Sequence, residues 1–294
     1  MLPTTAQGGG VPDAELVIAG ARLAEQAGFD SVHVGDHLLH PHPMLEALVT
    51  LGFVAASTER IAFGPCVMLL ALREPVALAK QLSTLAAFAP GRLRLGVGVG
   101  GEYPDEFDAV GIPLDERGQR LGERVIELRS LLATGRDDRF DATVIGSPGD
   151  VPPVVFGGWH EASLRRAARL GDGWIGYLLN HDGFARRRRY LAEQRQQLDL
   201  TAPFTFGMLV PVLHDPAEGA SARAAALWSG LTQRSGAFPT DRFAAGSADA
   251  IVTMLAGFEE CDEVILAPAD QGSGFLDHIA VLGDVVLPRL RAAS

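Results

Sequence analysis

Apolar and polar positions alternate along this chain in two regular ways. Short apolar runs predict strands at 31–35, 61–68, 93–99, 154–156, 174–177, 204–212 and 263–267. Longer runs with apolar residues at helical spacing predict helices at 13–27, 45–57, 115–132, 161–170, 184–198 and 275–291, with one more that opens at 74–75. In the first of these helices Leu16, Gly20, Leu23 and Ala27 share one face, and Gly28 is well placed to end it. Strands that alternate with helices predict βα units and a parallel sheet.

The number of predicted strands favours a closed barrel. Seven strands, with Leu2-Pro3 as the candidate remnant of another, approach the eight that a (β/α)₈ barrel requires. We therefore predict an α/β fold, a TIM-type barrel whose first strand is shortened or missing, and a single domain over 1–294. An open, doubly wound sheet is the structural alternative. The segments near 100–114, 134–150 and 215–245 interrupt the alternation and are interpreted as loop insertions.

Small residues share one face of several predicted strands. Val32 and Val34 lie on one face of their strand and Gly35 on the other, because successive side chains alternate. In a barrel the bulky faces would meet the helices and the small faces would point inward. We expect a hollow near Gly35, Gly64 and Gly98 that takes a flat ligand. The alternative is that these glycines only let the strands bend.

Charge and composition exclude several classes of partner. The formal net charge of −11 gives an acidic surface that repels nucleic acid and anionic lipid. The N-terminus lacks the basic and apolar parts of a secretory signal, and no apolar stretch approaches the roughly 20 residues that span a bilayer. We expect a cytoplasmic protein without nucleic-acid or membrane partners. Cys66 and Cys261 fit no metal-binding spacing, and reduced thiols are favoured over a disulfide.

Several motifs, in their order along the chain, resemble the luciferase-like monooxygenase superfamily. They are LAEQAGFDSV at 23–32 with Asp36-His37, RIAFG at 60–64, PVALAKQLSTL at 75–85, GRLRLGVG at 91–98, GGEYP at 100–104 with Glu106-Phe107, Gly157-Gly158, and AARLGDGW at 167–174. The resemblance is strong over about 13–180 and rests on order and spacing beyond that. It implies a TIM-like barrel that binds reduced FMN or the deazaflavin coenzyme F420 at the carboxyl ends of its strands, and it implies a homodimer.

The resemblance implies a luciferase-like oxidoreductase acting on a small organic substrate. With the deazaflavin the chemistry would be hydride transfer, and with reduced FMN it would be monooxygenation. The Gly-Gly-Glu loop at 100–102 and the arginine-rich composition favour the deazaflavin. A non-catalytic flavin-binding barrel and a metal-dependent barrel hydrolase are the alternatives from other classes.

His37 and Glu102 are the predicted catalytic residues. His37 follows the strand at 31–35 with inward parity, and an imidazole titrates near neutral pH, so it can pass a proton to or from a substrate. The resemblance implies the same role. Glu102 follows the strand at 93–99 and is favoured over its rival Glu106 as a proton donor or acceptor. Asp36, of opposite parity, is interpreted as orienting His37 or capping a turn, and is kept among the cofactor-binding candidates.

The remaining cofactor candidates lie where predicted strands end. Gly157-Gly158 stands between a strand and a helix, where free backbone N–H groups can cradle a phosphate, although two glycines can also serve as a plain turn. Trp174 on the next strand is either a pocket residue or a core residue. The resemblance places a non-proline cis peptide at Cys66-Val67. The list of candidates is completed by Gly64 and Gly98.

Two residues are predicted to bind substrate, and no metal is expected. Arg73 follows the strand at 61–68 and could reach an anionic group, while Tyr103 would pack at the pocket rim. His40 and His42 invite a metal site together with His37. The two prolines among them favour a loop whose histidines point apart, so we expect no bound metal.

Overall fold

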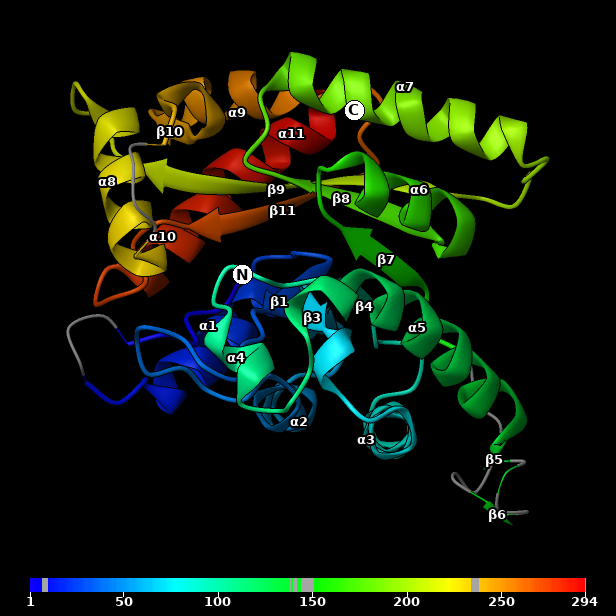
Figure 1. Cartoon of the computed structure of the whole chain (residues 1–294). Coiled ribbons are helices and arrows are strands. Elements are labelled where there is room, and N and C mark those ends of the chain that lie inside the picture. The colour runs from blue at the N-terminus through cyan, green and yellow to red at the C-terminus, as the bar shows by residue number, and fades with distance from the viewer. Residues whose placement is uncertain (7–9, 138, 140–141, 144–150, 234–237, 294) are drawn as a thin grey trace.

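The computed structural model describes residues 1–6, 10–137, 139, 142–143, 151–233 and 238–293. Parallel strands form a barrel, and helices cover it from outside. The helices α2 (Ala47–Ser57) and α3 (Pro75–Phe88) lie on one side, and α7 (His181–Gln197) and α9 (Ala248–Ala256) lie on the other (Figure 1). The barrel strands are β1 (Ser31–Val34), β2 (Ala62–Pro65), β3 (Met68–Leu69), β4 (Leu95–Gly98), β7 (Val154–Gly157), β8 (Gly173–Tyr177), β9 (Thr205–His214) and β11 (Glu263–Pro268). The strands alternate with helices as the sequence predicts.

The order of the strands defines the barrel. In one sheet the hydrogen-bonded order is β3-β4-β7-β8-β9, and β11 pairs with the other side of β9. β1 pairs with β2, and a parallel bridge between Phe63 and Leu93 joins β2 to the strand that contains β4. Because β2 and β3 are two parts of one strand position, these contacts make a continuous parallel sheet from β1 round to β11.

Met1 and Leu2 fill the gap that is left between β11 and β1. The amino group of Met1 donates to the carbonyl oxygen of Leu266 at 2.7 Å, and the amide of Leu2 donates to the carbonyl oxygen of His33 at 2.8 Å. The fold is therefore a TIM-type (β/α)₈ barrel in which the first strand position is short, as predicted. The closure excludes the open doubly wound sheet.

The helices that were predicted with bounds lie near those bounds, the last of them divided into parts, and further helices occur in segments for which no bounds were given. The helices are α1 (Ala14–Gln26), α2 (Ala47–Ser57), α3 (Pro75–Phe88), α4 (Asp105–Asp108), α5 (Arg117–Thr134), α6 (Glu161–Leu170), α7 (His181–Gln197), α8 (Ala220–Thr232), α9 (Ala248–Ala256), α10 (Phe275–Val281) and α11 (Leu287–Ala293). Pro75 occupies the first turn of α3, and Gly28 follows α1 with a left-handed φ of 82°. Among the described residues, no helix combines the length and apolarity needed to cross a membrane.

The buried face of α1 differs from the prediction. Val17, Gly20, Ala21 and Ala24 are buried, whereas Leu16 and Leu23 are only half-buried. Gly20 explains the rotation, because a side chain there would place its Cβ 2.6 Å from the Phe275 ring. Glycine at this position therefore lets α1 and the Phe275 ring of α10 pack closely together.

The three predicted insertions contain regular structure. The segment 100–114 holds α4, and the segment 215–245 holds α8 and the short strand β10 (Ala244–Gly246). In the segment 134–150, β5 (Arg136–Asp137) pairs antiparallel with β6 (Ala142–Thr143), while 138, 140–141 and 144–150 lie outside the described residues. The insertion at 215–245 thus contains a helix of its own, and α8 buries Ala224, Trp228 and Leu231.

The expected hollow near Gly64 is not present. A Cβ atom at Gly64 would lie 2.0 Å from the carbonyl oxygen of Arg94, and one at Gly96 would lie 2.6 Å from that of Pro65. These glycines let the backbones of β2 and β4 approach each other. A cavity does open further along the strands, at their carboxyl ends, where Gly35 and Gly98 border it.

Candidate active site

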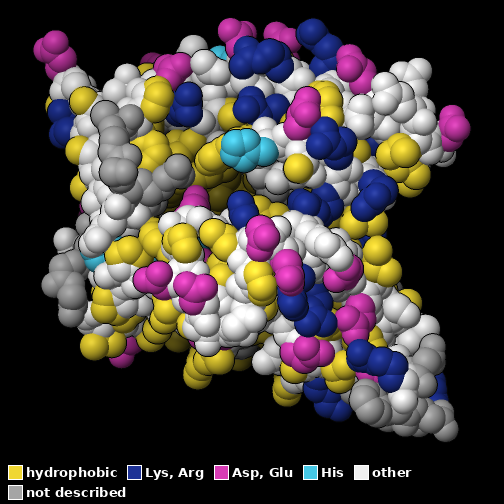
Figure 2. All heavy atoms as spheres, in the orientation of Figure 1, with side chains coloured by type: hydrophobic (Ala, Val, Ile, Leu, Met, Phe, Trp, Pro, Cys, Tyr) yellow, Lys and Arg dark blue, Asp and Glu magenta, His cyan; other side chains and the backbone are white. Residues whose placement is uncertain are grey.

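A cavity of about 440 Å³ opens at the carboxyl ends of the barrel strands. This volume is within the range of ordinary ligand pockets. In Figure 2 hydrophobic side chains form the wall of the hollow, a histidine lies at its rim and basic side chains gather beside it. Nine of the predicted site residues line it, namely Asp36, His37, Cys66, Val67, Gly98, Glu102, Tyr103, Gly157 and Gly158. Gly64, Arg73 and Trp174 do not.

His37 and Glu106 form a hydrogen-bonded pair at the cavity wall. Nδ1 of His37 lies 3.3 Å from each carboxylate oxygen of Glu106. The Glu106 side chain is fully buried, and one of its oxygens also accepts from the amide of Leu38 at 3.1 Å. Because the carboxylate occupies Nδ1, it leaves Nε2 of His37 for a ligand. Sequence reasoning favoured Glu102, but the carboxylate that contacts His37 is Glu106.

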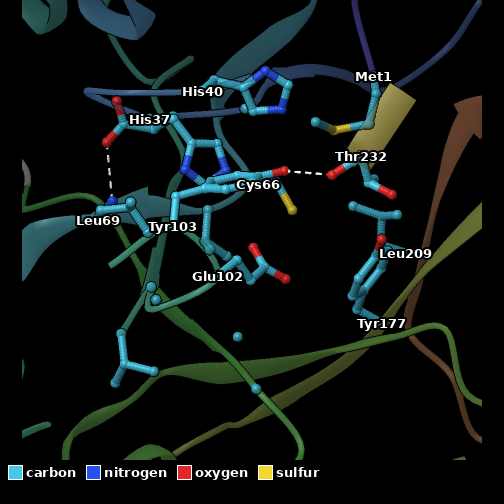
Figure 3. Close-up of a pocket in the computed structure, with 18 of the residues that line it drawn as sticks. Met1, His37, His40, Cys66, Leu69, Glu102, Tyr103, Tyr177, Leu209 and Thr232 are labelled. Carbon is cyan, nitrogen blue, oxygen red and sulfur yellow. Dashed lines mark hydrogen bonds between the residues drawn. The ribbon is translucent and has the colours of Figure 1, made fainter. Parts of the chain in front are cut away.

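Tyr103 and Glu102 lie beside this pair. The Tyr103 ring meets His37 edge to face at 4.9 Å between centroids, and its hydroxyl donates to the carbonyl oxygen of Thr232 at 2.7 Å (Figure 3). Tyr103 thus connects the loop after β4 to the end of α8. Glu102 precedes it in the same loop, and Figure 3 shows the Glu102 carboxylate directed into the cavity.

His40 and His42 hydrogen-bond to each other. The amide of His42 donates to Nδ1 of His40 at 3.1 Å, and burial lowers the pKa of His40. Nε2 of His42 lies 2.8 Å from the carbonyl oxygen of Gly230 on α8. Within the described ranges, no group of three or more His, Cys, Asp or Glu side chains is arranged to hold a metal ion.

Arg73 is bound by two carboxylates instead of facing the cavity. Its guanidinium donates to Asp36 at 2.6 Å and to Glu46 at 2.9 Å. Burial opposes its charge, but the two carboxylates outweigh this effect and raise the pKa of Arg73. Asp36 also accepts from the amide of Leu69 at 2.9 Å. These hydrogen bonds connect Asp36, the residue before His37, to Leu69 in β3 and to Arg73.

Trp174 lies behind the cavity wall. Its side chain is fully buried, stacks on Phe184 at 5.6 Å between centroids, and donates from the indole nitrogen to the carbonyl oxygen of Gly158 at 2.7 Å. Of the two predicted roles, pocket residue or core residue, the structure gives Trp174 the second. The next residue of β8, Ile175, points inward and lines the cavity instead.

Val67 forms the floor of the cavity between two glycines. The Cys66–Val67 peptide bond is cis, as the sequence resemblance implied. A Cβ atom at Gly98 would lie 2.4 Å from one γ-methyl group of Val67, and a Cβ atom at Gly157 would lie 2.9 Å from the other. The adjoining Cys66 thiol stays protonated, because burial raises its pKa to about 12.

An anion-binding geometry lies above β4 and β7. Gly158 adopts a φ of 121° just before α6, and Ser163 lies in the first turn of that helix. Arg117 at the start of α5 also lines the cavity, and its Nε is buried without a hydrogen-bond partner among the described residues. Free helix N–H groups beside an arginine suit a phosphate. Sequence reasoning missed Arg117, because an arginine in a predicted helix looks like an ordinary solvated residue.

This arrangement fits a flavin-type cofactor. The end that contains Gly158, Ser163 and Arg117 offers N–H donors and a positive charge for a phosphate group. The floor at Val67 and Gly98 is apolar and presents no side chain beyond the valine methyl groups, which suits the face of a planar ring. Both ends of the cavity therefore present groups that suit the corresponding parts of such a cofactor.

Comparisons with known proteins agree with the geometry. The family model described as luciferase-like monooxygenase matches residues 2–260. The chain is 40% identical over 172 residues to an F420-dependent glucose-6-phosphate dehydrogenase of Beutenbergia cavernae, and the match covers 52% of this chain and 49% of that protein. The chain thus spans about half the length of this relative.

Solved structures share the fold at low identity. An F420-dependent secondary alcohol dehydrogenase in complex with an F420-acetone adduct superposes with a TM-score of 0.76 at 18% identity, covering 95% of both chains. The oxygenating constituent of 3,6-diketocamphane monooxygenase from Pseudomonas putida, in complex with FMN, gives a TM-score of 0.72 at 16% identity, covering 94% of this chain and 93% of that one. Barrels of this kind therefore accompany either cofactor.

Proposed function

Since this chain belongs to the luciferase-like monooxygenase family, we propose that it is an oxidoreductase that uses coenzyme F420 to exchange a hydride with a small organic substrate. The observation that carries the proposal is the His37–Glu106 pair, which borders the same cavity as the partnerless Nε of Arg117. The sequence similarity to an F420-dependent dehydrogenase favours the deazaflavin over FMN.

The cofactor would be held at two places. Arg117, Ser163 and the backbone at Gly157-Gly158 would bind its phosphate, because they combine a cation with free N–H donors. Val67 and Gly98 would contact the face of its ring. When bound, a deazaflavin supplies a ring carbon that accepts or returns a hydride.

His37 would move the proton that accompanies the hydride. Its Nε2 would take a proton from a substrate hydroxyl group, while Glu106 holds Nδ1 and stabilises the positive charge that develops on the ring. Tyr103 packs against the imidazole at 4.9 Å between centroids and would limit the access of water. Glu102 is the second carboxylate that could take part in proton transfer.

Exposed apolar side chains on two adjacent helices support the proposed homodimer. Val49 and Phe53 lie one turn apart on α2 and are 64% and 63% exposed, and Phe88 at the end of α3 is 81% exposed. α2 packs beside α3. Large apolar side chains that gather on one side of a surface are typical of a protein interface.

Cofactor titration tests the proposed function. The purified protein would be titrated with F420 and with FMN, following the fluorescence of each. We expect F420 to bind at least about tenfold more tightly than FMN, and Arg117→Ala to weaken its binding about tenfold or more, because a charge-assisted hydrogen bond to phosphate contributes about 1.5–3 kcal/mol. Arg120→Ala on the same helix, where Arg120 pairs with Glu116, is the matched control.

The same titration separates the rival functions. Preferred binding of FMN, with oxygen consumption on reduction, would indicate a monooxygenase instead. Cofactor binding without turnover of any alcohol or carbonyl compound would indicate a non-catalytic flavin-binding barrel. If neither cofactor bound, the proposal would be wrong.

A further inference from the structure

The cavity wall opposite His37 is apolar. β8 lies four strand positions from β1 in the eight-position barrel, so the wall that begins on β8 faces His37 across the mouth. Its members from β8 and β9 are Ile175, Tyr177 and Leu209, and Figure 3 shows the last two across the cavity from His37. α8, which follows β9, extends this wall with side chains from its final turns.

The polar groups of this wall bond within the protein, and the hydroxyl of Thr232 donates to the carbonyl oxygen of Trp228 at 3.0 Å. The indole nitrogen of Trp228 donates to the hydroxyl of Tyr177 at 2.8 Å. The Tyr177 ring also lies 6.2 Å from Trp159 and 6.4 Å from Trp228 between centroids. Leu231 follows Trp228 by one turn of α8 and is only 7% exposed. A ligand therefore meets ring faces and hydrocarbon here.

The described arginine and lysine side chains are placed away from this wall. Among the described residues that line the cavity, Arg117 is the single arginine or lysine, and it lies above β4 and β7. Arg73 is held by Asp36 and Glu46 outside the cavity. A charged group on the substrate would have to leave water and lie against this apolar wall, which is costly without a partner.

We propose that the substrate is an uncharged aliphatic alcohol, or the carbonyl compound formed from it, whose hydrocarbon part lies against Leu209, Trp228 and Leu231. This inference rests on the proposed function. In oxidation, the carbon-bound hydrogen leaves with two electrons to the oxidised deazaflavin, the hydroxyl proton passes to His37, and a C=O bond forms. The sugar phosphate named for the Beutenbergia relative does not match this wall.

Ligand binding, measured apart from turnover, tests this substrate class. Methyl ketones of increasing chain length and glucose 6-phosphate would be titrated into cofactor-free and F420-saturated protein, by calorimetry and tryptophan fluorescence. We expect the affinity for ketones to rise by up to about fourfold for each added methylene, because each buries apolar surface. Glucose 6-phosphate is expected to show no saturable binding at the concentrations that saturate the longer ketones.

Substitutions at two positions of α8 test which side chains form the wall. Leu231→Glu should weaken ketone binding at least tenfold, whereas Leu227→Glu, at a more exposed position one turn earlier on α8, should leave it within twofold. If Leu231→Glu fails to fold, Leu231→Ala tests the same wall, because a wider cavity should shift the preference to longer ketones. Leu227→Ala is its control.

The outcomes separate this inference from the proposed function. Tighter binding of glucose 6-phosphate than of any ketone, or ketone affinity that does not depend on chain length in either form, would overturn the substrate class. F420 binding together with turnover of sugar phosphates would do the same while the redox function stood. Ketone binding with the predicted trend, but no F420 binding, would support the substrate class and remove the redox function.

Discussion

Two histidines at the same strand of the barrel have different environments. His33 lies within β1 and is 4% exposed, with its Nε2 3.0 Å from the Ser31 hydroxyl and 4.0 Å from a carboxylate oxygen of Glu263. His37 lies just beyond the end of β1, borders the cavity and has the Glu106 carboxylate 3.3 Å from Nδ1. Both positions have the same parity, so alternation alone treats them alike.

The difference lies in what stabilises a protonated ring. Burial lowers the pKa of His33 to about 3, so His33 stays neutral through the physiological range. At His37 a fully buried carboxylate contacts the ring and can compensate a positive charge. A histidine is suited to proton transfer when an acidic group contacts one ring nitrogen and the other nitrogen is open to a ligand. The position of a residue on the inward face of a strand does not by itself provide either condition.

The largest expected effect comes from removing the imidazole at the mouth. His37→Ala should lower kcat by about a hundredfold to ten-thousandfold, the usual contribution of a positioned general acid or base. The dissociation constant for F420 should change by no more than about twofold, because the phosphate is held elsewhere. Steady-state kinetics and a cofactor titration measure the two quantities. An unchanged kcat would show that His37, like His33, takes no part in proton transfer.

The next effect comes from removing the charge beside His37. Glu106→Gln should lower kcat by about ten- to a hundredfold, because a hydrogen bond to a charged group contributes about 1.5–3 kcal/mol. Cofactor affinity should be kept. Glu102→Gln is the comparison, since Glu102 lines the cavity without being the carboxylate that contacts His37. A greater loss of kcat in E102Q than in E106Q would show that Glu102, the carboxylate that the sequence favours, is the catalytic one.

The smallest effect concerns stability and comes from His33. Below pH 6.5, the unfolded chain protonates this residue, while the folded protein does not until the pH approaches 3, so stability falls as the pH is lowered through this window. At about pH 5 the loss is about 2 kcal/mol relative to neutral pH. Urea unfolding at the two pH values measures it.

A substitution identifies the source of this acid sensitivity. His33→Asn should flatten the dependence of unfolding free energy on pH, whereas His160→Asn, at an exposed position, should leave it unchanged. Part of the slope should remain in H33N, because burial also lowers the pKa of His278, to about 4. A slope identical to that of the unmodified protein would show that His33 does not contribute.

The architecture could be predicted well from the sequence, because the positions of strands and helices depend on the periodicity of apolar residues. Strand and helix positions follow from apolar spacing, and Gly28 and Pro75 mark helix boundaries through their backbone preferences. The cis peptide at Cys66–Val67 was accessible only through family resemblance. Nine predicted site residues gather at the cavity because they follow the carboxyl ends of parallel strands, which meet at one rim.

The sequence could not resolve contacts between distant segments. A glycine with inward parity can leave space for a ligand or admit a neighbouring backbone, and only the position of Arg94 shows that Gly64 does the latter. Arg73 looks available until Asp36 and Glu46 are seen to bind it. The choice between Glu102 and Glu106 likewise depended on α4, whose turn brings Glu106 to His37.

The contact of Val67 with Gly98 and Gly157 has a consequence for engineering this barrel. Residues from three neighbouring strand positions share one small volume, so an alanine at Gly98 or Gly157 collides with a valine methyl group. In a mutant library that varies one position at a time, nearly every substitution at either glycine would clash with Val67. Shortening Val67 to alanine first would release room for a methyl group on β4 or β7, so new shapes of the floor become reachable only through paired changes.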